Sequence, residues 1–413
     1  MTRSNSELVA AAMVLPVYGT DANDATPDQR AANSSIYGVE TAAEVVSKFR
    51  PAGLLLVERI PFHEGFADVK LGMLDSSERL RSFVEGVQEV ARVEQMEPLL
   101  IVADQEGGAG SRLPGVALPA PAIIGGTRDS AVAKEAGRLT SQVARAHGVG
   151  VVLGPLADLG LGNAAIGDRA FSADPHEVAR LAASWVSGVQ GSRVQVTDEQ
   201  GSRVQVTDEQ GSNAASTGIV AVAKHWPGHG RANADSHVSV PVLDVDASVW
   251  ASEELVPFAA TINAQVAGIL VAHLRAPSID PSGALASQSF ALTNKLRREH
   301  GFTGFTMTDA LWMPSARTSA ASDAQVAVRS LQAGIDLLLA PPDPAGTCTL
   351  ASTTPDLSEH MQSHSPQSHH PQSQLLRSSQ DRITRLRSRH PAVDRRIDLD
   401  ELNAEIQHFN ATL

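Results

Sequence analysis

The sequence predicts an α/β protein built on a single (β/α)8 barrel, followed by a low-complexity segment and terminal helices. Short apolar runs alternate with longer amphipathic stretches, as in a parallel sheet whose strands are joined by helices. The runs are apolar throughout, which is typical of strands buried on both faces. Eight of them fit into roughly 340 residues, as a closed barrel requires. The alternative is an open doubly wound sheet, which usually has a glycine-rich phosphate loop after its first strand; none follows here.

The eight predicted strands are rich in Val, Leu, Ile and Ala. They cover residues 9–17, 53–57, 98–103, 149–156, 218–223, 267–272, 304–308 and 335–339. Between them, residues 78–90 and 176–186 have apolar side chains at helical spacing. Arg3 and the apolar residues after it also resemble a signal peptide, but Pro16 interrupts the run. We therefore expect a core strand there.

We expect three segments: the barrel at 1–345, a linker at 346–374 and a helical segment at 375–413. The linker is rich in Ser, His, Gln and Pro, a composition that cannot bury a core. A metal site formed by its histidines is the alternative. The helices expected beyond it are Leu375–Arg389 and Leu399–Phe409. A solvated face is expected for the arginines at 377, 382, 385, 387 and 389.

A perfect tandem repeat precedes the fifth predicted strand. Residues 191–200 recur unchanged at 201–210, which indicates a duplication within a surface loop and not a solenoid, whose repeats are longer and more numerous. Because the repeat precedes a strand, we expect it at the amino-terminal end of the barrel, away from the chemistry.

Composition excludes several classes of partner. The net charge of −13 argues against nucleic acid or an anionic membrane as a partner, and no apolar stretch reaches membrane-spanning length. The single cysteine, Cys348, excludes an intrachain disulfide and fits a reducing compartment. We therefore expect a cytoplasmic protein that acts on a small molecule, with a monomer favoured.

Polar residues follow five of the predicted strands. They are Asp104, Asp158, His225, His273 and Asp309. An aspartate at a strand end is usually a helix cap, but five titratable groups at five strand ends are harder to explain in that way. In a barrel all five lie around one mouth, where active sites are found.

The segment 224–237 holds three histidines, a lysine and an aspartate. Pro227 and Gly228 prevent a helix, so His225 and His229 lack the spacing of a helical zinc site. The alternatives for His225 and His229 are that they bind zinc or that they have a purely structural role. Asp235 precedes His237 by two residues, and a carboxylate so close can orient an imidazole and stabilise its protonated form. Such a pair is suited to general acid/base work.

This segment resembles the signature of glycoside hydrolase family 3, in particular its bacterial β-N-acetylhexosaminidase branch. The similar residues are Lys224–Gly230, with Trp226 where Phe is usual, and Asp235-Ser-His237. Three further segments resemble family motifs and occur in the family's order: Asp104-Gln-Glu-Gly-Gly108, Ile166–Ser172 and Thr306–Met313. The resemblance covers about residues 10–340.

The resemblance implies a retaining exo-β-N-acetylglucosaminidase that hydrolyses terminal β-linked GlcNAc from peptidoglycan fragments or chito-oligosaccharides. It makes Asp309 the nucleophile and His237 the acid/base, with Asp235 as its partner. The implied substrate-binding residues are Asp104, Arg112, Arg169, Lys224 and His225. No metal and no organic cofactor is implied.

One departure from the family pattern bears on these roles. Ala109-Gly110 stands where an arginine is usual, and arginine comes only at Arg112. Lys224 can also form a salt bridge to a strand-end carboxylate, which is compatible with sugar binding. A β-glucosidase or a phosphorylase of the same family, and a non-catalytic sugar-binding protein, are the alternatives.

Overall fold

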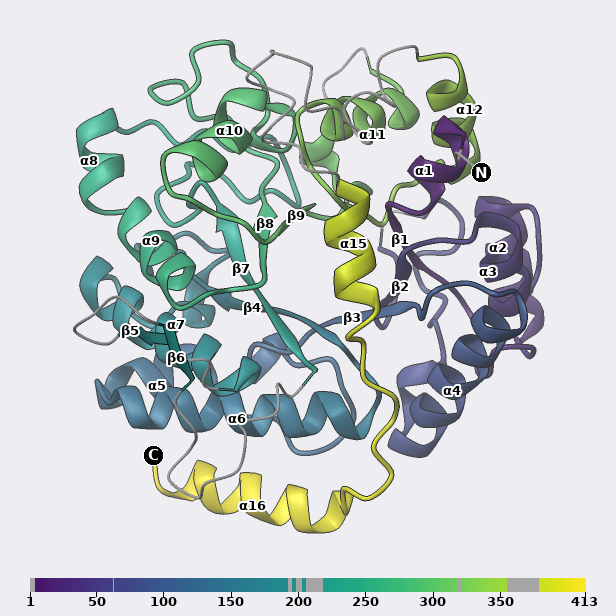
Figure 1. Cartoon of the computed structure of the whole chain (residues 1–413), viewed down its shortest axis with the longest axis horizontal. Coiled ribbons are helices and arrows are strands. Elements are labelled where there is room, and N and C mark those ends of the chain that lie inside the picture. Colours follow the sequence, from purple (N-terminus) through teal and green to yellow (C-terminus); the bar gives the residue numbers. More distant parts are fainter. Residues whose placement is uncertain are drawn as a thin grey trace.

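The computed structural model describes residues 4–61, 63–191, 195–197, 203–205, 218–317, 321–354 and 379–413. Eight parallel strands lie at its centre in the order β10-β1-β2-β3-β4-β7-β8-β9 (Figure 1). They are β1 (Met13–Pro16), β2 (Gly53–Leu56), β3 (Leu100–Asp104), β4 (Val151–Leu156), β7 (Val220–Trp226), β8 (Gly268–Val271), β9 (Phe305–Thr308) and β10 (Leu338–Leu339). A bridge between Met307 and Leu337 joins the two edges, so the sheet closes into the predicted barrel.

Helices surround the strands. They are α1 (Asn5–Ala10), α2 (Pro27–Tyr37), α3 (Ala42–Phe49), α4 (Ser77–Val93), α5 (Pro121–Thr127), α6 (Ser130–Ala146), α7 (Pro175–Gln190), α8 (Ala247–Ser252), α9 (Leu255–Asn263), α10 (Phe290–Arg298), α11 (Asp323–Gln332), α12 (Pro344–Ser352), α15 (Ser379–Arg387) and α16 (Leu399–Ala411). Both helical stretches singled out in the sequence lie within α4 and α7. Among the described helices, none combines the length and apolar character needed to cross a bilayer.

Local sequence explains where several helices begin and how closely two of them pack. Capping boxes start α2 at Thr26, α3 at Thr41 and α11 at Ser322, each with Glu or Gln three residues later. The helices α6 and α7 approach closely because Gly137 lies against the backbone of α7. A Cβ at Gly137 would be 2.2 Å from the carbonyl oxygen of Trp185.

The first predicted strand begins later than expected. Leu8, Val9 and Ala10 belong to α1, which Ser4 and Glu7 start with a capping box, and β1 begins only at Met13. These residues are buried as predicted, but in a helix. A short apolar run does not by itself distinguish a buried helix from a buried strand, and the capping pair decides here.

The expected solvated arginine face on the last-but-one helix is wrong for two of its residues. Arg382 and Arg387 are buried. Arg382 donates to Asp336 at 2.6 Å, and Arg387 donates to the carbonyl oxygen of Pro98 at 2.8 Å. Both acceptors precede strands, so α15 covers the amino-terminal end of the barrel (Figure 1).

Asp336 explains why an arginine is needed there. Burial alone would raise the pKa of Asp336, but Arg382 and Arg297 outweigh it and lower this pKa to about 2. A buried carboxylate at a strand start requires such partners.

The insertion with the repeat leaves the barrel at its amino-terminal end. It follows α7, whose Gln190 accepts hydrogen bonds from the backbone N–H groups of Ala221 and Ala267 beside β7 and β8. Within it, β5 (Gln195–Thr197) pairs antiparallel with β6 (Arg203–Gln205). Apart from Gly191, the remaining repeat residues lie outside the described part, as do Arg377 and the segment 355–378. The first residues assigned to the linker are helical, since α12 extends to Ser352.

Candidate active site

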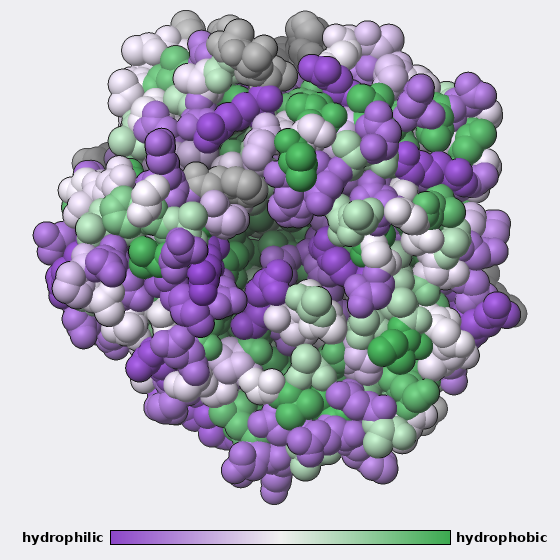
Figure 2. Space-filling view, turned by 180° about the vertical axis from the view of Figure 1, so that it is seen from behind, coloured by the Kyte–Doolittle hydropathy of each residue, from purple (hydrophilic) through white to green (hydrophobic). Residues whose placement is uncertain are grey.

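A cavity of about 560 Å³ opens at the carboxyl ends of the strands. Figure 2 shows this hollow near the centre of the face opposite to that of Figure 1, with hydrophilic residues around much of its rim. Seven of the eight predicted site residues line it: Asp104, Arg112, Arg169, Lys224, His225, His237 and Asp309. The eighth, Asp235, contacts His237. The fold therefore brings together residues that lie more than 200 positions apart in the chain.

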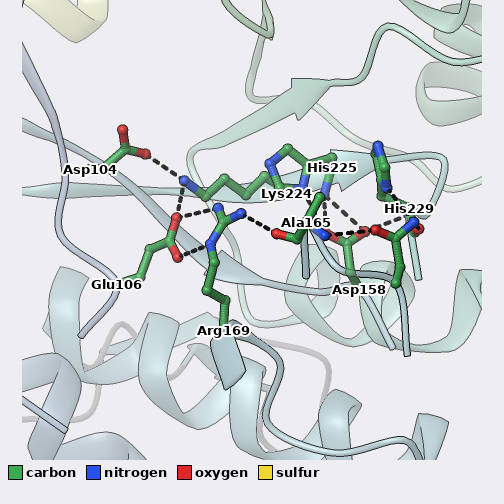
Figure 3. Close-up of polar contacts among 9 residues, drawn as sticks. Asp104, Glu106, Asp158, Ala165, Arg169, Lys224, His225 and His229 are labelled. Atoms are coloured by element: carbon green, nitrogen blue, oxygen red, sulfur yellow. Dashed lines mark hydrogen bonds and ion pairs between the residues drawn. The ribbon is translucent and has the colours of Figure 1, made fainter. Parts of the chain in front are cut away.

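A cluster of two cations and two anions forms one wall of the cavity (Figure 3). Lys224, near the end of β7, donates to Asp104 at 2.6 Å and also contacts Glu106. Arg169 is the last residue of the short 3-10 turn η3 (Gly167–Arg169) and donates two hydrogen bonds of 2.8 Å to the Glu106 carboxylate. The predicted salt bridge of Lys224 is confirmed, and Glu106 is the residue that joins both cations.

Charge pairing keeps Glu106 and Lys224 ionised although both are buried. Burial alone would raise the pKa of Glu106, but Lys224 and Arg169 outweigh it and lower this pKa to about 2. Burial would lower the pKa of Lys224, yet Asp104 and Glu106 raise it above its usual value. The cluster is thus a fixed set of donors and acceptors with no net charge, which suits hydroxyl groups better than an anion.

Asp158 orients His225, which lies in β7, and His229, which lies in the loop that follows. It is completely buried, and its Oδ2 lies 2.6 Å from Nδ1 of His225. The backbone N–H groups of His225 and His229 also donate to it, the latter at 2.7 Å. Burial would raise the pKa of Asp158, but the two histidines outweigh it and lower this pKa. Asp158 therefore remains an acceptor that holds the His225 ring at the cavity wall (Figure 3).

Asp309 lies directly after β9 and lines the cavity. Its backbone N–H donates to Val271 at 2.9 Å, and its Oδ1 accepts from the backbone N–H of Ala310 at 2.8 Å. Burial would raise the pKa of Asp309, but the nearby His225 and His273, the Ala310 N–H group and Lys224 lower it. Asp309 is consequently an anionic carboxylate in a partly enclosed cavity, with one oxygen held by the backbone.

Asp235 and His237 form a pair on the exposed loop that follows β7. Oδ1 of Asp235 lies 2.8 Å from both the backbone nitrogen and Nδ1 of His237. The His237 side chain is 54% exposed and borders the cavity. Burial would raise the pKa of Asp235, but the N–H group and imidazole of His237 lower it. The carboxylate can therefore orient this imidazole, as the spacing predicted.

The strand-end prediction is wrong for two residues. Asp158 and His273 are completely buried and do not border the cavity. His273 contacts Ser287 at 2.8 Å, behind Asp309. Sequence reasoning also missed Glu106, although the paired cations Lys224 and Arg169 require a second carboxylate and Asp104-Gln-Glu offers one. Among the described residues, no group of three or more His, Cys, Asp or Glu could hold a metal ion.

Comparison with known proteins agrees with this geometry. The sequence profile of the "Glycosyl hydrolase family 3 N terminal domain" matches residues 39–374. A Beta-hexosaminidase of Idiomarina loihiensis is 31% identical over 292 residues, which cover 67% of this chain and 80% of that protein. A Beta-hexosaminidase of Nitrosomonas eutropha is 34% identical over 256 residues, which cover 60% of this chain and 66% of that protein.

Solved structures agree on the fold. A glycoside hydrolase family 3 beta-N-acetylglucosaminidase from Paenibacillus sp. str. FPU-7 superposes with a TM-score of 0.73 at 22% identity, over 99% of this chain and 69% of that one. NagZ from Neisseria gonorrhoeae superposes with a TM-score of 0.66 at 20% identity, over 97% of this chain and 98% of that one. The profile match, the relatives and the barrel together show that this chain belongs to glycosyl hydrolase family 3, whose enzymes cleave glycosidic bonds.

Proposed function

We propose that this glycoside hydrolase is a retaining exo-β-N-acetylglucosaminidase that removes terminal β-linked GlcNAc from peptidoglycan fragments or chito-oligosaccharides. The observation that carries the proposal is that a partly buried carboxylate, Asp309, and a paired imidazole, His237, border one cavity beside a neutral donor and acceptor cluster. The relatives named Beta-hexosaminidase support the choice of sugar.

In the first step, Asp309 attacks the anomeric carbon and forms a glycosyl ester. The bond from that carbon to the leaving oxygen breaks, and its electron pair stays on the oxygen. Protonated His237 gives that oxygen its Nε2 proton, because its Nδ1 faces Asp235. A carboxylate suits the attack because the transition state resembles an oxocarbenium ion.

In the second step, His237 acts as a base. Its neutral imidazole takes a proton from water, whose oxygen attacks the anomeric carbon, and the bond to Asp309 breaks. Two inversions at one carbon leave the sugar with its original configuration. Asp235 stabilises the imidazolium that reforms, so the enzyme returns to its starting state.

The sugar is held by the charged cluster and its neighbours. Oδ1 of Asp104 faces Lys224, so its second oxygen is the acceptor for a sugar hydroxyl. Lys224, Arg169 and His225 supply donors from fixed positions. Arg112 is exposed at the rim and donates to the carbonyl oxygen of Ala109, where it can reach the N-acetyl group or the aglycone. A volume of about 560 Å³ lies in the range of small-ligand sites.

The experiment that tests this function compares nitrophenyl β-glycosides of GlcNAc, GalNAc and glucose under the same conditions. We expect the GlcNAc substrate to have the highest kcat/KM, and NMR of the first-formed product to show the β-anomer. A higher kcat/KM for the glucoside, or an α-anomer as first product, would contradict the proposal.

A further inference from the structure

The loop that carries the acid/base pair has few hydrogen bonds to the rest of the protein. We define the acid/base loop as residues 228–241. Its tip is solvent-exposed: the Val238 residue is 76% exposed and the His237 side chain 54%. A catalytic group must be held within a fraction of an ångström of its working position, so such a loop requires an anchor near the pair.

Asn163 is that anchor. It lies in the connection between β4 and α7. Its amide nitrogen lies 2.7 Å from the carbonyl oxygen of Ala232 and 3.3 Å from those of His229 and Ala234. Its Oδ1 accepts from the backbone N–H of Ala165 at 2.9 Å, which fixes the direction in which the amide points.

The other polar contacts of the loop with the rest of the protein lie before residue 234 or after residue 240. Asp158 accepts from the N–H of His229 at the start, and Asn233, in the first half of the loop, pairs with Val242, which follows the loop. Arg231 forms an ion pair with Glu253, but through its side chain. Within the described ranges, no side chain outside the loop other than that of Asn163 forms a hydrogen bond to its backbone between residues 230 and 240.

Asn163 also joins this loop to the sugar-binding cluster. The backbone N–H groups of Ile166 and Gly167 both donate to its carbonyl oxygen at 3.0 Å, which starts the turn leading to Arg169. Arg169 in turn donates to the carbonyl oxygen of Ala165 at 2.8 Å. One residue therefore sets the relative position of the segment that holds the sugar and the segment that protonates the leaving group.

We propose that Asn163 is the positioning residue that holds the Asp235–His237 pair against the leaving-group oxygen. The inference rests on the proposed role of His237 and adds to it the element that places the imidazole. Loss of the amide donor leaves the loop carbonyls without their partner, and the loop then samples positions in which His237 cannot reach the substrate. The defect falls on acid catalysis and leaves the attack by Asp309 in place.

The test uses Asn163→Asp. Aspartate keeps an oxygen that accepts from Ala165, so the turn to Arg169 survives, but it has no amide hydrogen for the loop and repels the carbonyl oxygens. The matched control is Asn410→Asp, which removes a 3.0 Å hydrogen bond to the carbonyl oxygen of Ala117 outside the cavity lining. Both are compared with the parent enzyme and with His237→Ala.

The readout is kcat/KM for aryl β-GlcNAc substrates with leaving groups of low and high pKa, because this parameter reports the first chemical step. For Asn163→Asp we expect a loss of about 10- to 100-fold on the poor leaving group and under about 3-fold on the good one, since general acids contribute about 10²–10⁴-fold. Asn410→Asp should match the parent. The double variant with His237→Ala should be no slower than His237→Ala alone.

Equal losses on both substrates, or no loss on either, would overturn the positioning role. If His237→Ala itself lacks the leaving-group dependence, the proposed function fails instead, so the two failures are distinguishable. If thermal denaturation shows that Asn163→Asp is not folded, the uncharged variant Asn163→Ser is used in its place. The serine hydroxyl also accepts from the backbone N–H of Ala165, but the side chain is too short to reach the loop. The same expected and contradicting results apply to that variant.

Discussion

Nδ1 of His225 lies 2.6 Å from Oδ2 of Asp158, and this carboxylate is completely buried between the loop and β4. The same carboxylate accepts the backbone N–H groups of His225 and His229. One buried anion thus fixes both an imidazole at the cavity wall and the start of the loop that carries His237. Asp158 does not border the cavity, so its effect on substrate is transmitted through His225.

Asp158→Asn should be severely destabilising and should lower activity. The amide of asparagine has the same shape as the carboxylate of Asp158. It lacks the buried negative charge, however, and it places an NH₂ group against the N–H groups of His225 and His229. Leaving a buried donor without its acceptor costs about 1–3 kcal/mol, so we expect a loss of at least that order in the free energy of unfolding and at least a tenfold drop in kcat/KM. Denaturant titration and kinetics measure both. The exposed Asp168→Asn is the control, and an Asp158 variant as stable as this control would refute the account.

Arg382→Ala should reduce stability without changing chemistry. It removes the partner that donates to Asp336 at 2.6 Å, although Arg297 still contacts that carboxylate at 2.8 Å. We expect a loss of about 3 kcal/mol in the free energy of unfolding, at the lower end for a broken buried pair, with kcat/KM unchanged. Arg385→Ala, on an exposed position of the same helix, should have almost no effect. Equal stabilities of the two variants would show that Arg382 is not a structural partner.

Glu254 should make stability depend on pH. It is fully buried below Gly228, and Arg231 Nε lies 3.2 Å from Oε1 without forming a hydrogen bond. Burial and the charge of Asp158 raise the pKa of Glu254 to about 8. Because this pKa is higher in the folded state than in the unfolded state, the group's stabilising contribution is complete below about pH 4.5 and is lost as pH rises through about 8.

Glu254→Gln removes this loss, so its advantage in Tm over the parent should grow from pH 4 to pH 9. At pH 9 we expect a gain on the order of 2–4 °C, which corresponds to about 1 kcal/mol in a large domain. Differential scanning calorimetry across this range checks it. A difference in Tm that does not change with pH would mean that the carboxyl group ionises normally.

Water should be preferred over phosphate as the acceptor. The cavity cations Lys224 and Arg169 are already paired with Asp104 and Glu106, so their cluster has no net charge to attract an anion. Added inorganic phosphate should therefore leave turnover unchanged and GlcNAc as the product. GlcNAc-1-phosphate as the main product, with turnover rising with phosphate, would identify a phosphorylase.

The barrel could be predicted from the sequence because its strands are continuous apolar runs. Even β10, which has only two paired residues, Leu338 and Leu339, lies within the apolar run 335–339 that predicts a strand. Helix α1 could not be, because Leu8–Ala10 are apolar in either structure and a capping pair decided the outcome. The apolar pattern therefore predicts the strands of the sheet more reliably than it predicts the structure of the residues before the first strand.

The site was only partly predictable, for a physical reason. Asp104, His237 and Asp309 stand in segments that resemble family motifs, and the resemblance implied their roles. Glu106 and Asp158 act by compensating charges that only the fold brings near them. The burial of Arg382 has the same cause, since Asp336 is 46 residues away in sequence. Pairing between distant segments leaves little signal in a single sequence.

The most direct test of the account is to trap the covalent intermediate on Asp309. A fluorinated GlcNAc donor with a good leaving group forms the glycosyl ester faster than it is hydrolysed, and peptide mass spectrometry then locates the sugar. We predict the added mass on the peptide that contains Asp309, with Asp309→Ala unlabelled, folded and almost inactive. Labelling of a peptide with a different carboxylate, or substantial turnover by Asp309→Ala, would contradict the account.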